Sequence, residues 1–510
     1  MDGLQHIPAG QTIPSSVHGV SVSIPDIASV VGFESHDDRT LRRIRRGYPR
    51  FRVHPYARRV AGMTRDHLDA TGALADLGYR CASVEMTRSA QSAARAAAYA
   101  GLPPAAVVGA YGVSGVAIPG GRDGGGHVRE FVQRTGCHLS SREAEDVLLR
   151  EGVIVSRQPE RTRPDDPERR IADVLASAYG VGDPHFVSLH NSGMNAVYAA
   201  ISTLAELQAR RGRRLWLQLG WIFFDTAKLF ERGIVEADHR LLPDPFDVDR
   251  LAQVVAAHAG EIAGIVAEVP SNPLLQTPDL PALREIADRA GCAVVIDATI
   301  GTPYNVDVLE YADVACESLT KYATGSADVL MGAAVVNPAS PFAQPLDDGL
   351  RRRGDRPYHR DAARVAERVA GYESRMAQVN ANAMVLAEFF HKQPAVRRVH
   401  WAYEPRSEAN FRKVERHPEA PGGLLMLDLD VPVESVYDHL AVAKGPSFGA
   451  EFTMAAPQVF VAHFDLLSDP GGRAVLGAHG LHRDMLRVSV GTEDIDRITA
   501  TFEEAFHHAR

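Results

Sequence analysis

The middle of the chain alternates between short apolar runs and amphipathic segments. The apolar runs predict buried strands at 185–189, 262–269, 292–296, 312–316 and 329–336. The amphipathic segments predict helices at 196–207 and 281–290, the second of them closed by Gly291. Buried strands that alternate with helices indicate a mostly parallel sheet covered on both faces. In such sheets ligands bind at the carboxyl ends of the strands.

The two flanks of this region differ from it in composition and in the pattern of apolar positions. The first 160 residues or so are rich in Arg and Gly, and a Gly-rich patch at 119–126 lacks the Gly-Lys-Ser/Thr ending of a phosphate loop, so we predict a plain loop there. A polar stretch at 161–167 indicates a linker or a helix entry. Near the end, a strand pattern at 423–429 and an amphipathic pattern at 495–502 predict a smaller α+β unit.

We therefore expect three parts. These are an N-terminal extension or dimer arm at 1–165, a large domain at 166–390 and a small domain at 391–510. The pattern leaves open whether residues 60–160 form a regulatory module or an elaborated dimer arm.

Composition narrows the class of protein. The chain has 510 residues, 45% of them hydrophobic and 23% charged, with a formal net charge of -9 and no long basic block. Nucleic acid and anionic membrane are therefore not expected partners. No apolar run reaches the length of a membrane span, and no secretory signal pattern is visible at the start. The four cysteines are far apart, which favours reduced thiols in a cytoplasmic protein.

One lysine stands where a catalyst would. The chain has only five lysines among 55 basic residues, and Lys321 closes the run 312–321, directly after an apolar strand pattern and two hydroxyl residues. An amine at a strand end can be desolvated, which lowers its pKa and makes it a nucleophile suited to Schiff-base chemistry. The alternative is that base composition favours arginine over lysine and that Lys321 is simply solvated.

Polar residues recur at the ends of the other predicted strands. Asp297 ends the run 292–296, and Ser192 and Gly193 open the helix predicted at 196–207. Alone, each is an ordinary cap or turn residue. Together with Lys321 they match the needs of pyridoxal phosphate, which are a lysine for its aldehyde, a carboxylate for its pyridine nitrogen and an anion cradle for its phosphate.

Five segments resemble motifs of the Cys/Met-metabolism pyridoxal-phosphate enzymes, the cystathionine γ-synthase, γ-lyase and β-lyase group. They are the lysine motif at 318–322, E-x-P-S-N-P at 268–273, D-x-T at 297–299, S-G-M at 192–194 and R-x-S-x-G-x-E-D at 487–494. They occur in the family's order and spacing, over about residues 180 to 510.

The resemblance implies a fold and a site. The expected fold is α/β of fold type I (aspartate aminotransferase-like), with a mostly parallel seven-stranded sheet in the large domain and a smaller α+β C-terminal domain. Lys321 would be the catalytic residue, and Arg487 would hold the substrate α-carboxylate. The expected cofactor-binding residues are Ser192, Gly193, Met194, Phe223, Asn272, Asp297, Thr299, Ser318, Thr320 and Lys321. Glu268 and Ser447 are expected at the substrate with Arg487.

The N-terminal part resembles a narrower subgroup, the long fungal-type cystathionine γ-synthases, through segments at 47–55, 135–142 and 444–449. In the family a Tyr-x-Arg pair reaches the phosphate of the neighbouring subunit's cofactor. By that resemblance Tyr48 and Arg50 would act across the interface of a homodimer or a dimer of dimers. The alternative is a packed aromatic and a surface charge.

The pattern breaks at one position beside the cofactor. The family's ring-stacking tyrosine aligns with Phe223, although Trp221 and Phe224 are close enough to compete for that place. Phenylalanine can stack on a ring but cannot move a proton. Lys321 would then handle most proton transfers, unless another hydroxyl such as Tyr48 or Tyr322 replaces the missing one. Ser326 and Ala298 stand where many relatives have histidine and asparagine.

The implied activity is γ-replacement on a γ-activated amino acid such as an O-acyl- or O-phosphohomoserine, with a thiol or carbon nucleophile. A specialised enzyme that forms a carbon–carbon bond at Cγ, or that uses S-adenosylmethionine, is an alternative that the change at Phe223 favours. Simple γ-elimination by a lyase and a non-catalytic binding relative are further alternatives. The sequence leaves the leaving group and the nucleophile open.

Overall fold

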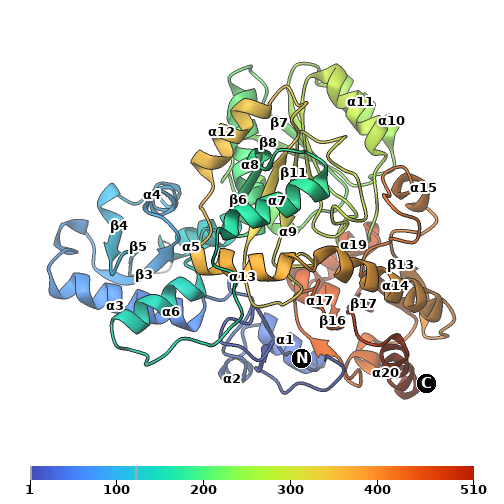
Figure 1. Cartoon of the computed structure of the whole chain (residues 1–510), viewed down its shortest axis with the longest axis horizontal. Helices are drawn as coiled ribbons and strands as arrows, with labels where there is room; N and C mark the ends of the chain where they lie inside the picture. Colours follow the sequence, from blue (N-terminus) through green and yellow to red (C-terminus); the bar gives the residue numbers. More distant parts are fainter. Residues whose placement is uncertain (1–2, 121–123, 510) are drawn as a thin grey trace.

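A seven-stranded sheet forms the centre of the molecule in the computed structural model, which describes residues 3–120 and 124–509 (Figure 1). Its strands, in spatial order, are β6 (Val187–His190), β12 (Gly332–Val336), β11 (Val314–Ser318), β10 (Ala293–Asp297), β9 (Ile262–Glu268), β7 (Leu215–Leu219) and β8 (Asp238–Leu242). Only β12 is antiparallel to its neighbours. The expected mostly parallel sheet is therefore confirmed, although β11 and β12 begin two to three residues later than the apolar runs suggested.

Helices cover both faces of this sheet, as its buried inner strands require. One face packs against α7 (Pro167–Tyr179), α10 (Val248–Ala257), α11 (Leu280–Ala290), α13 (His359–Val369) and α14 (Tyr372–His391). The other face packs against α8 (Gly193–Ala209), α9 (Phe224–Glu231) and α12 (Ala343–Arg353). Alternate residues of each strand enter the two cores, so both layers depend on the same strands.

The C-terminal part forms a second, five-stranded sheet. Its order is β13 (Val396–His400), β14 (Leu424–Leu429), β17 (Met485–Ser489), β16 (Met454–Pro457) and β15 (Ala443–Lys444), with only β15 and β16 parallel. The associated helices are α15 (Glu408–Phe411), α16 (Val433–Tyr437), α17 (Gln458–Ala462), α18 (Phe464–Leu467), α19 (Pro470–Ala478) and α20 (Ile495–His508). Figure 1 shows this part in orange and red beside the N-terminal helices α1 and α2.

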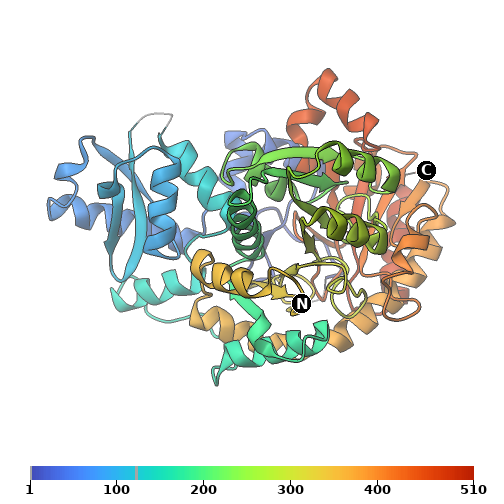
Figure 2. The same cartoon turned by 90° about the horizontal axis from the view of Figure 1, so that it is seen from above.

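The N-terminal part divides in two. The first elements, β1 (Thr12–Ile13), β2 (Ser21–Val22), α1 (Ile27–Glu34) and α2 (Asp38–Arg43), lie against the C-terminal part. The next elements, drawn in blue and cyan in Figures 1 and 2, project to one side of the large sheet. They are α3 (Pro55–Ala70), β3 (Cys81–Thr87), α4 (Ala90–Tyr99), β4 (Val107–Ala110), β5 (Val113–Pro119), α5 (Gly124–Thr135) and α6 (Ser141–Arg150). We call residues 55–150 the side module and residues 44–54 the arm.

The side module has its own antiparallel sheet, in the order β3, β5, β4. Of the loop predicted at 119–126, residues 121–123 lie outside the described residues and Gly124 already begins α5. All four cysteines lie in the described ranges and are free thiols. Across residues 3–120 and 124–509, no helix has the length and apolar character needed to cross a membrane.

Candidate active site

Lys321 lies in a buried turn just after β11. Its Nζ donates a hydrogen bond of 2.9 Å to Ser447 Oγ and lies 4.7 Å from the ring centroids of both Tyr48 and Phe448. Burial lowers the pKa of the Lys321 amine well below its usual value, and the positive charges of Arg487 and Arg50 lower it further. Burial therefore favours the neutral amine, the form that can attack an aldehyde.

Asp297 ends the neighbouring strand β10 and is oriented by Thr299. The Thr299 backbone N–H and Oγ1 both donate to Asp297 Oδ1, at 3.0 and 2.6 Å, and the Ser318 N–H in turn donates to Thr299 Oγ1. Burial raises the pKa of Asp297, although the Thr299 hydrogen bonds oppose that. A buried carboxyl group of this kind favours a cationic partner, which a protonated pyridine nitrogen supplies.

The start of α8 lies directly against the end of β11. A Cβ added at Gly193 would come within 2.6 Å of the Ser318 Cβ, so only glycine permits this approach. Ser192 caps α8 by accepting from the Asn195 N–H, and its own hydroxyl donates to the Gly136 carbonyl. The backbone N–H groups at a helix start together with hydroxyl residues nearby form an anion cradle.

These features fit pyridoxal phosphate. Lys321 offers a neutral amine for the aldehyde, Asp297 a buried carboxyl for the ring nitrogen, and the α8 start with Ser318 and Thr320 a cradle for the phosphate. Among the described residues, Asn272 Oδ1 is a buried atom with no hydrogen-bond partner. Such an atom calls for a partner from a ligand or solvent. Asp297, Thr299, Ser318 and Gly193 form one continuous set of contacts, and the individual roles of the predicted cofactor residues stay predictions.

Arg487 on β17 is buried and reaches the same region from the C-terminal part. Its Nη2 donates to the carbonyls of Pro446 and Ser447, at 3.0 and 3.1 Å, and its guanidinium lies 5.2 Å from the Phe448 ring centroid. Burial lowers its pKa to about 10, so it stays cationic at neutral pH. A buried guanidinium held by carbonyls favours an anionic partner such as a carboxylate.

Glu268 ends β9 directly beside Asp297 and is buried, and burial followed by the Asp297 charge raises its pKa well above the usual value. Its Oε2 has no hydrogen-bond partner within the part of the chain that the structure describes. Its expected role at the substrate stays a prediction.

The three candidate aromatic residues have different surroundings, although the rings of Phe223 and Phe224 lie 4.8 Å apart. Trp221 packs between His463 and His479, and Phe224 packs on Phe51. Phe223 instead lies against the guanidinium of Arg50. Which of the three faces the cofactor ring stays a prediction, and the alignment favours Phe223.

The arm lies in the site of its own chain. Arg50 Nη1 donates to Asp225 Oδ2 at 2.6 Å and to the Gln133 carbonyl at 2.8 Å, and the Tyr48 ring faces Lys321 Nζ. The sequence had led us to expect these two residues at the neighbouring subunit's cofactor. Within the chain they lie beside Lys321, and whether they act at this or at the neighbouring subunit's cofactor stays a prediction. Dimer formation stays a prediction.

Three contributors were missed from the sequence. Asp225 is fully buried and binds both Arg50 and Arg134, Phe448 packs on Lys321, and the loop at 136–138 packs on the α8 start, where Asn191 Nδ2 donates to the carbonyls of Gly136 and His138. Asp225 follows two phenylalanines, and a lone acid inside an apolar run was the one available signal.

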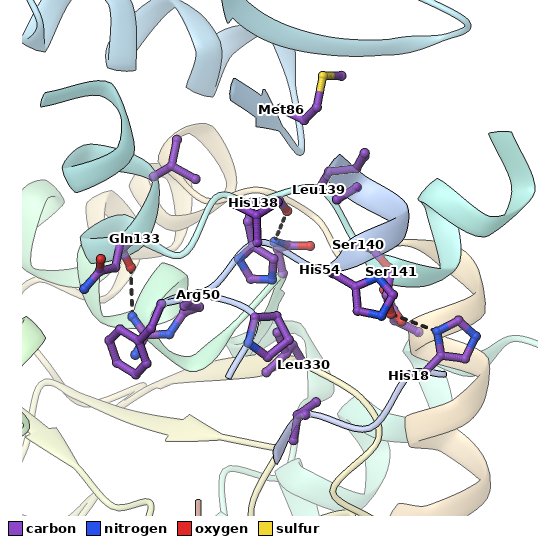
Figure 3. Close-up of a pocket in the computed structure, with 18 of the residues that line it drawn as sticks. His18, Arg50, His54, Met86, Gln133, His138, Leu139, Ser140, Ser141 and Leu330 are labelled. Atoms are coloured by element: carbon purple, nitrogen blue, oxygen red, sulfur yellow. Dashed lines mark hydrogen bonds between the residues drawn. The ribbon is translucent and has the colours of Figure 1, made fainter. Parts of the chain in front are cut away.

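Beside the arm lies a cavity of about 160 Å³ between Arg50, Gln133, His138 and His54 (Figure 3).

Comparisons with known proteins agree with this geometry. A family model described as Cys/Met metabolism PLP-dependent enzyme matches residues 165–507. The chain is 61% identical, over 98% of both chains, to an L-2-amino-4-chloropent-4-enoate dechlorinase/desaturase of Streptantibioticus cattleyicolor. It is 26% identical, over 97% of both chains, to a cystathionine γ-synthase of Neurospora crassa. A crystal structure of cystathionine γ-synthase from Xanthomonas oryzae pv. oryzae shares the fold, with a TM-score of 0.57 and 23% identity over 69% of this chain and 89% of that one.

Proposed function

The chain belongs to the Cys/Met metabolism family of PLP-dependent enzymes, and on that premise we propose that it removes hydrogen chloride from L-2-amino-4-chloropent-4-enoate or a closely similar γ-chlorinated amino acid. The observation that carries this proposal is the 61% identity, over 98% of both chains, to a dechlorinase/desaturase. The balance is simple: chloride leaves C4, a proton leaves a carbon beside C4, and the product has one further unsaturation.

Pyridoxal phosphate, when bound, supplies the aldehyde that captures the substrate amine and the ring that delocalises the electron pair left at Cα. The neutral Lys321 amine is suited to take the α-proton and to return it, because burial disfavours its charged form. Arg487 binds the α-carboxylate and thereby orients the Cα–H bond. Asp297 keeps the ring nitrogen protonated.

The side chains around Lys321 favour elimination over capture of a second substrate. The rings of Phe448 and Tyr48 face its amine, which also donates to Ser447, and Phe223 stands where relatives have a tyrosine. Aromatic walls exclude water and provide few hydrogen bonds to a polar nucleophile. The γ-elimination alternative thus becomes the preferred one.

The direct test is to incubate the purified holoenzyme with L-2-amino-4-chloropent-4-enoate and to follow chloride release and the product by NMR. We expect one chloride per product and no activity for Lys321→Ala, which should also lose the visible absorption of the lysine-bound cofactor. Absence of chloride release, together with thioether formation from O-acetyl- or O-succinylhomoserine and a thiol, would overturn the proposal.

That second outcome describes γ-replacement, which remains the second candidate. The similarity to the Neurospora crassa cystathionine γ-synthase over nearly the full length of both chains favours it.

A further inference from the structure

The side module packs directly on the start of α8, where the phosphate cradle is expected. Side chains at the α8 start donate to backbone carbonyls of the module's loop at 135–138, at 2.9 to 3.1 Å: Asn191 Nδ2 to Gly136 and His138, Ser192 Oγ to Gly136, and Asn195 Nδ2 to Thr135. The three donor residues are at most 2% exposed. Because a buried polar group is costly to leave without its partner, these bonds hold the loop firmly in place.

Gly136 permits this close contact. Its φ is +67°, a left-handed conformation that suits glycine, and a Cβ added there would collide with Ser192 Oγ and come within 3.1 Å of the Asn195 backbone nitrogen. The large sheet approaches the same turn as closely, since a Cβ added at Gly332 would lie 2.5 Å from the Gly193 backbone nitrogen. The α8 start is therefore packed tightly against both the large sheet and the side module.

Asp355, two residues after α12, joins the same elements at a second point. Its buried carboxylate accepts from the hydroxyl of Ser89, the N-cap of α4, and from that of Ser92 at 2.6 Å. Its backbone N–H donates to Asn195 Oδ1 at 2.7 Å, and its carbonyl accepts from the Asn191 N–H at 2.8 Å. Asp355 thus ties α4 of the side module to the two asparagines that hold the loop at 135–138.

The apolar core is continuous across this contact. Ala93 of α4 and Phe131 of α5 belong to the same buried cluster as Met194 and Val197 of α8. The rings of Phe131 and Tyr198 lie 6.0 Å apart, edge to face. A module that shares a core with the large domain cannot separate from it without exposing apolar surface, so its position fixes the position of the loop at 135–138.

We propose that the side module is a part of the cofactor's phosphate cradle, and that Asp355 is a positioning residue that fixes the module's loop at 135–138 on the α8 start. The loop restrains the turn whose backbone N–H groups face an anion, so these groups are preorganised for the phosphate. The proposal rests on the proposed function through the assignment of the α8 start to the cofactor phosphate. It makes no use of the arm and does not depend on which subunit's cofactor the arm serves.

The first experiment changes the loop without touching the α8 start itself. Gly136→Ala should weaken the affinity of the apoenzyme for pyridoxal phosphate at least tenfold, because the new methyl group displaces Ser192. The affinity for pyridoxal, which has no phosphate, should change less than threefold. Absorbance titration measures both. Unchanged affinity for pyridoxal phosphate, or equal loss of the two ligands, would overturn the proposal.

Gly101→Ala in the same module is the matched control. The φ of Gly101 is also +67°, so the backbone strain is the same, but an added Cβ meets nothing within 4 Å. We expect both affinities to change less than threefold; a tenfold loss here would attribute the effect of Gly136→Ala to strain and count against the proposal. If the native apoenzyme binds the two ligands equally well, the assignment of the α8 start to the phosphate is itself wrong, so the two failures can be told apart.

The second experiment tests Asp355 in a double-mutant cycle with the side module. Asp355→Asn and Ser92→Ala should each weaken pyridoxal-phosphate affinity three- to tenfold, and the double variant should be no weaker than the weaker single variant, because both changes remove the same contact. The affinity for pyridoxal should stay within threefold in all three. Losses that multiply, or no loss in either single variant, would show that Asp355 does not act through the side module. If Gly136→Ala does not fold, this cycle decides.

Discussion

Thr299 and the backbone of Ser318 set the direction of Asp297. Thr299 donates twice to one carboxylate oxygen, and Ser318 fixes the Thr299 hydroxyl from the next strand. A carboxyl group held in this way needs no reorganisation when charge develops on a ring beside it, which is the condition for strong electrostatic catalysis.

Asp297→Asn tests this role at the level of one atom. The amide keeps the size of the side chain but carries no charge, so it cannot stabilise a protonated ring nitrogen. We expect kcat to fall by about 10² or more, the size typical for loss of one preorganised electrostatic group. Steady-state kinetics of chloride release provide the measurement. Thr299→Val, which removes one of the two hydrogen bonds, should lose less, and equal losses in the two variants would contradict the assignment.

At the scale of elements, the site depends on how closely α8 approaches β11. Gly193 would place a Cβ 2.6 Å from the Ser318 Cβ and 2.9 Å from its Cα, so backbone atoms would have to move. The cradle therefore depends on the packing of two elements as well as on its polar groups.

Gly193→Ala should weaken pyridoxal-phosphate binding at least tenfold, because the α8 start must move away from Ser318. Absorbance titration of the apoenzyme measures it. The matched control is Gly62→Ala within α3, where an added Cβ meets nothing within 4 Å. That change should leave the affinity unaltered and stabilise the fold by up to ~1 kcal/mol, since alanine is the better helix former. Unchanged affinity in Gly193→Ala would refute the close-approach argument.

The stability of a second contact between elements, the His54 cap at the start of α3, depends on pH. His54 is the N-cap of α3: its Nδ1 accepts from the Tyr56 N–H, and its Nε2 donates to the Val17 carbonyl, so both nitrogens are used in the neutral form. Burial lowers the pKa of His54 to about 4 from the model-peptide value of 6.5. Its contribution to stability is therefore complete above pH 6.5 and is lost as the pH falls towards 4.

His54→Asn keeps a capping side chain but removes the titration. Between pH 7.5 and 5.5 the native protein should lose about 1.4 kcal/mol more unfolding free energy than the variant, since one group titrates over about one pH unit in that interval. Urea unfolding at the two pH values measures the difference. If the unfolding free energies of the two proteins depend on pH in the same way, the titration of His54 does not contribute to stability.

At the scale of the whole molecule, residues 151–166 form an irregular connection between the side module and the large domain. Val155 is 97% exposed, whereas the contacts that span the connection are largely buried, such as Arg142 with Glu160 and Arg360 with Glu145. The chain is thus accessible to cleavage at a point where its two sides remain joined by other contacts.

Limited trypsin digestion should cut first near Arg157, and the two fragments should stay together in native buffer. The ion pairs named above and the Arg50–Asp225 pair would hold them. Size-exclusion chromatography followed by a denaturing gel shows both fragments in one peak if this is correct. Separation of the fragments without denaturant would mean that these contacts contribute little.

The central sheet, the place of Lys321 and the cofactor could be predicted because each depends on short-range pattern. Strand runs are read from local hydrophobicity, and the residue that follows a parallel strand lies at the ligand-binding edge wherever the chain goes next. Asp297 and Lys321 therefore lie at the same edge of the sheet, because β10 and β11 are parallel neighbours with Asp297 opposite Cys316. The starts of β11 and β12 were less accurate, because apolar residues continue into the preceding turns.

The sequence by itself thus determined the family and the cofactor. Only the tertiary structure decided what holds the arm beside Lys321. Arg50 and Asp225 are 175 residues apart, and no periodicity connects a residue in an irregular segment to the first turn of a distant helix. Their pairing follows from how the side module packs on the large domain. That packing depends on the burial of many residues, and the contribution of any single residue is too small to be recognised in the sequence.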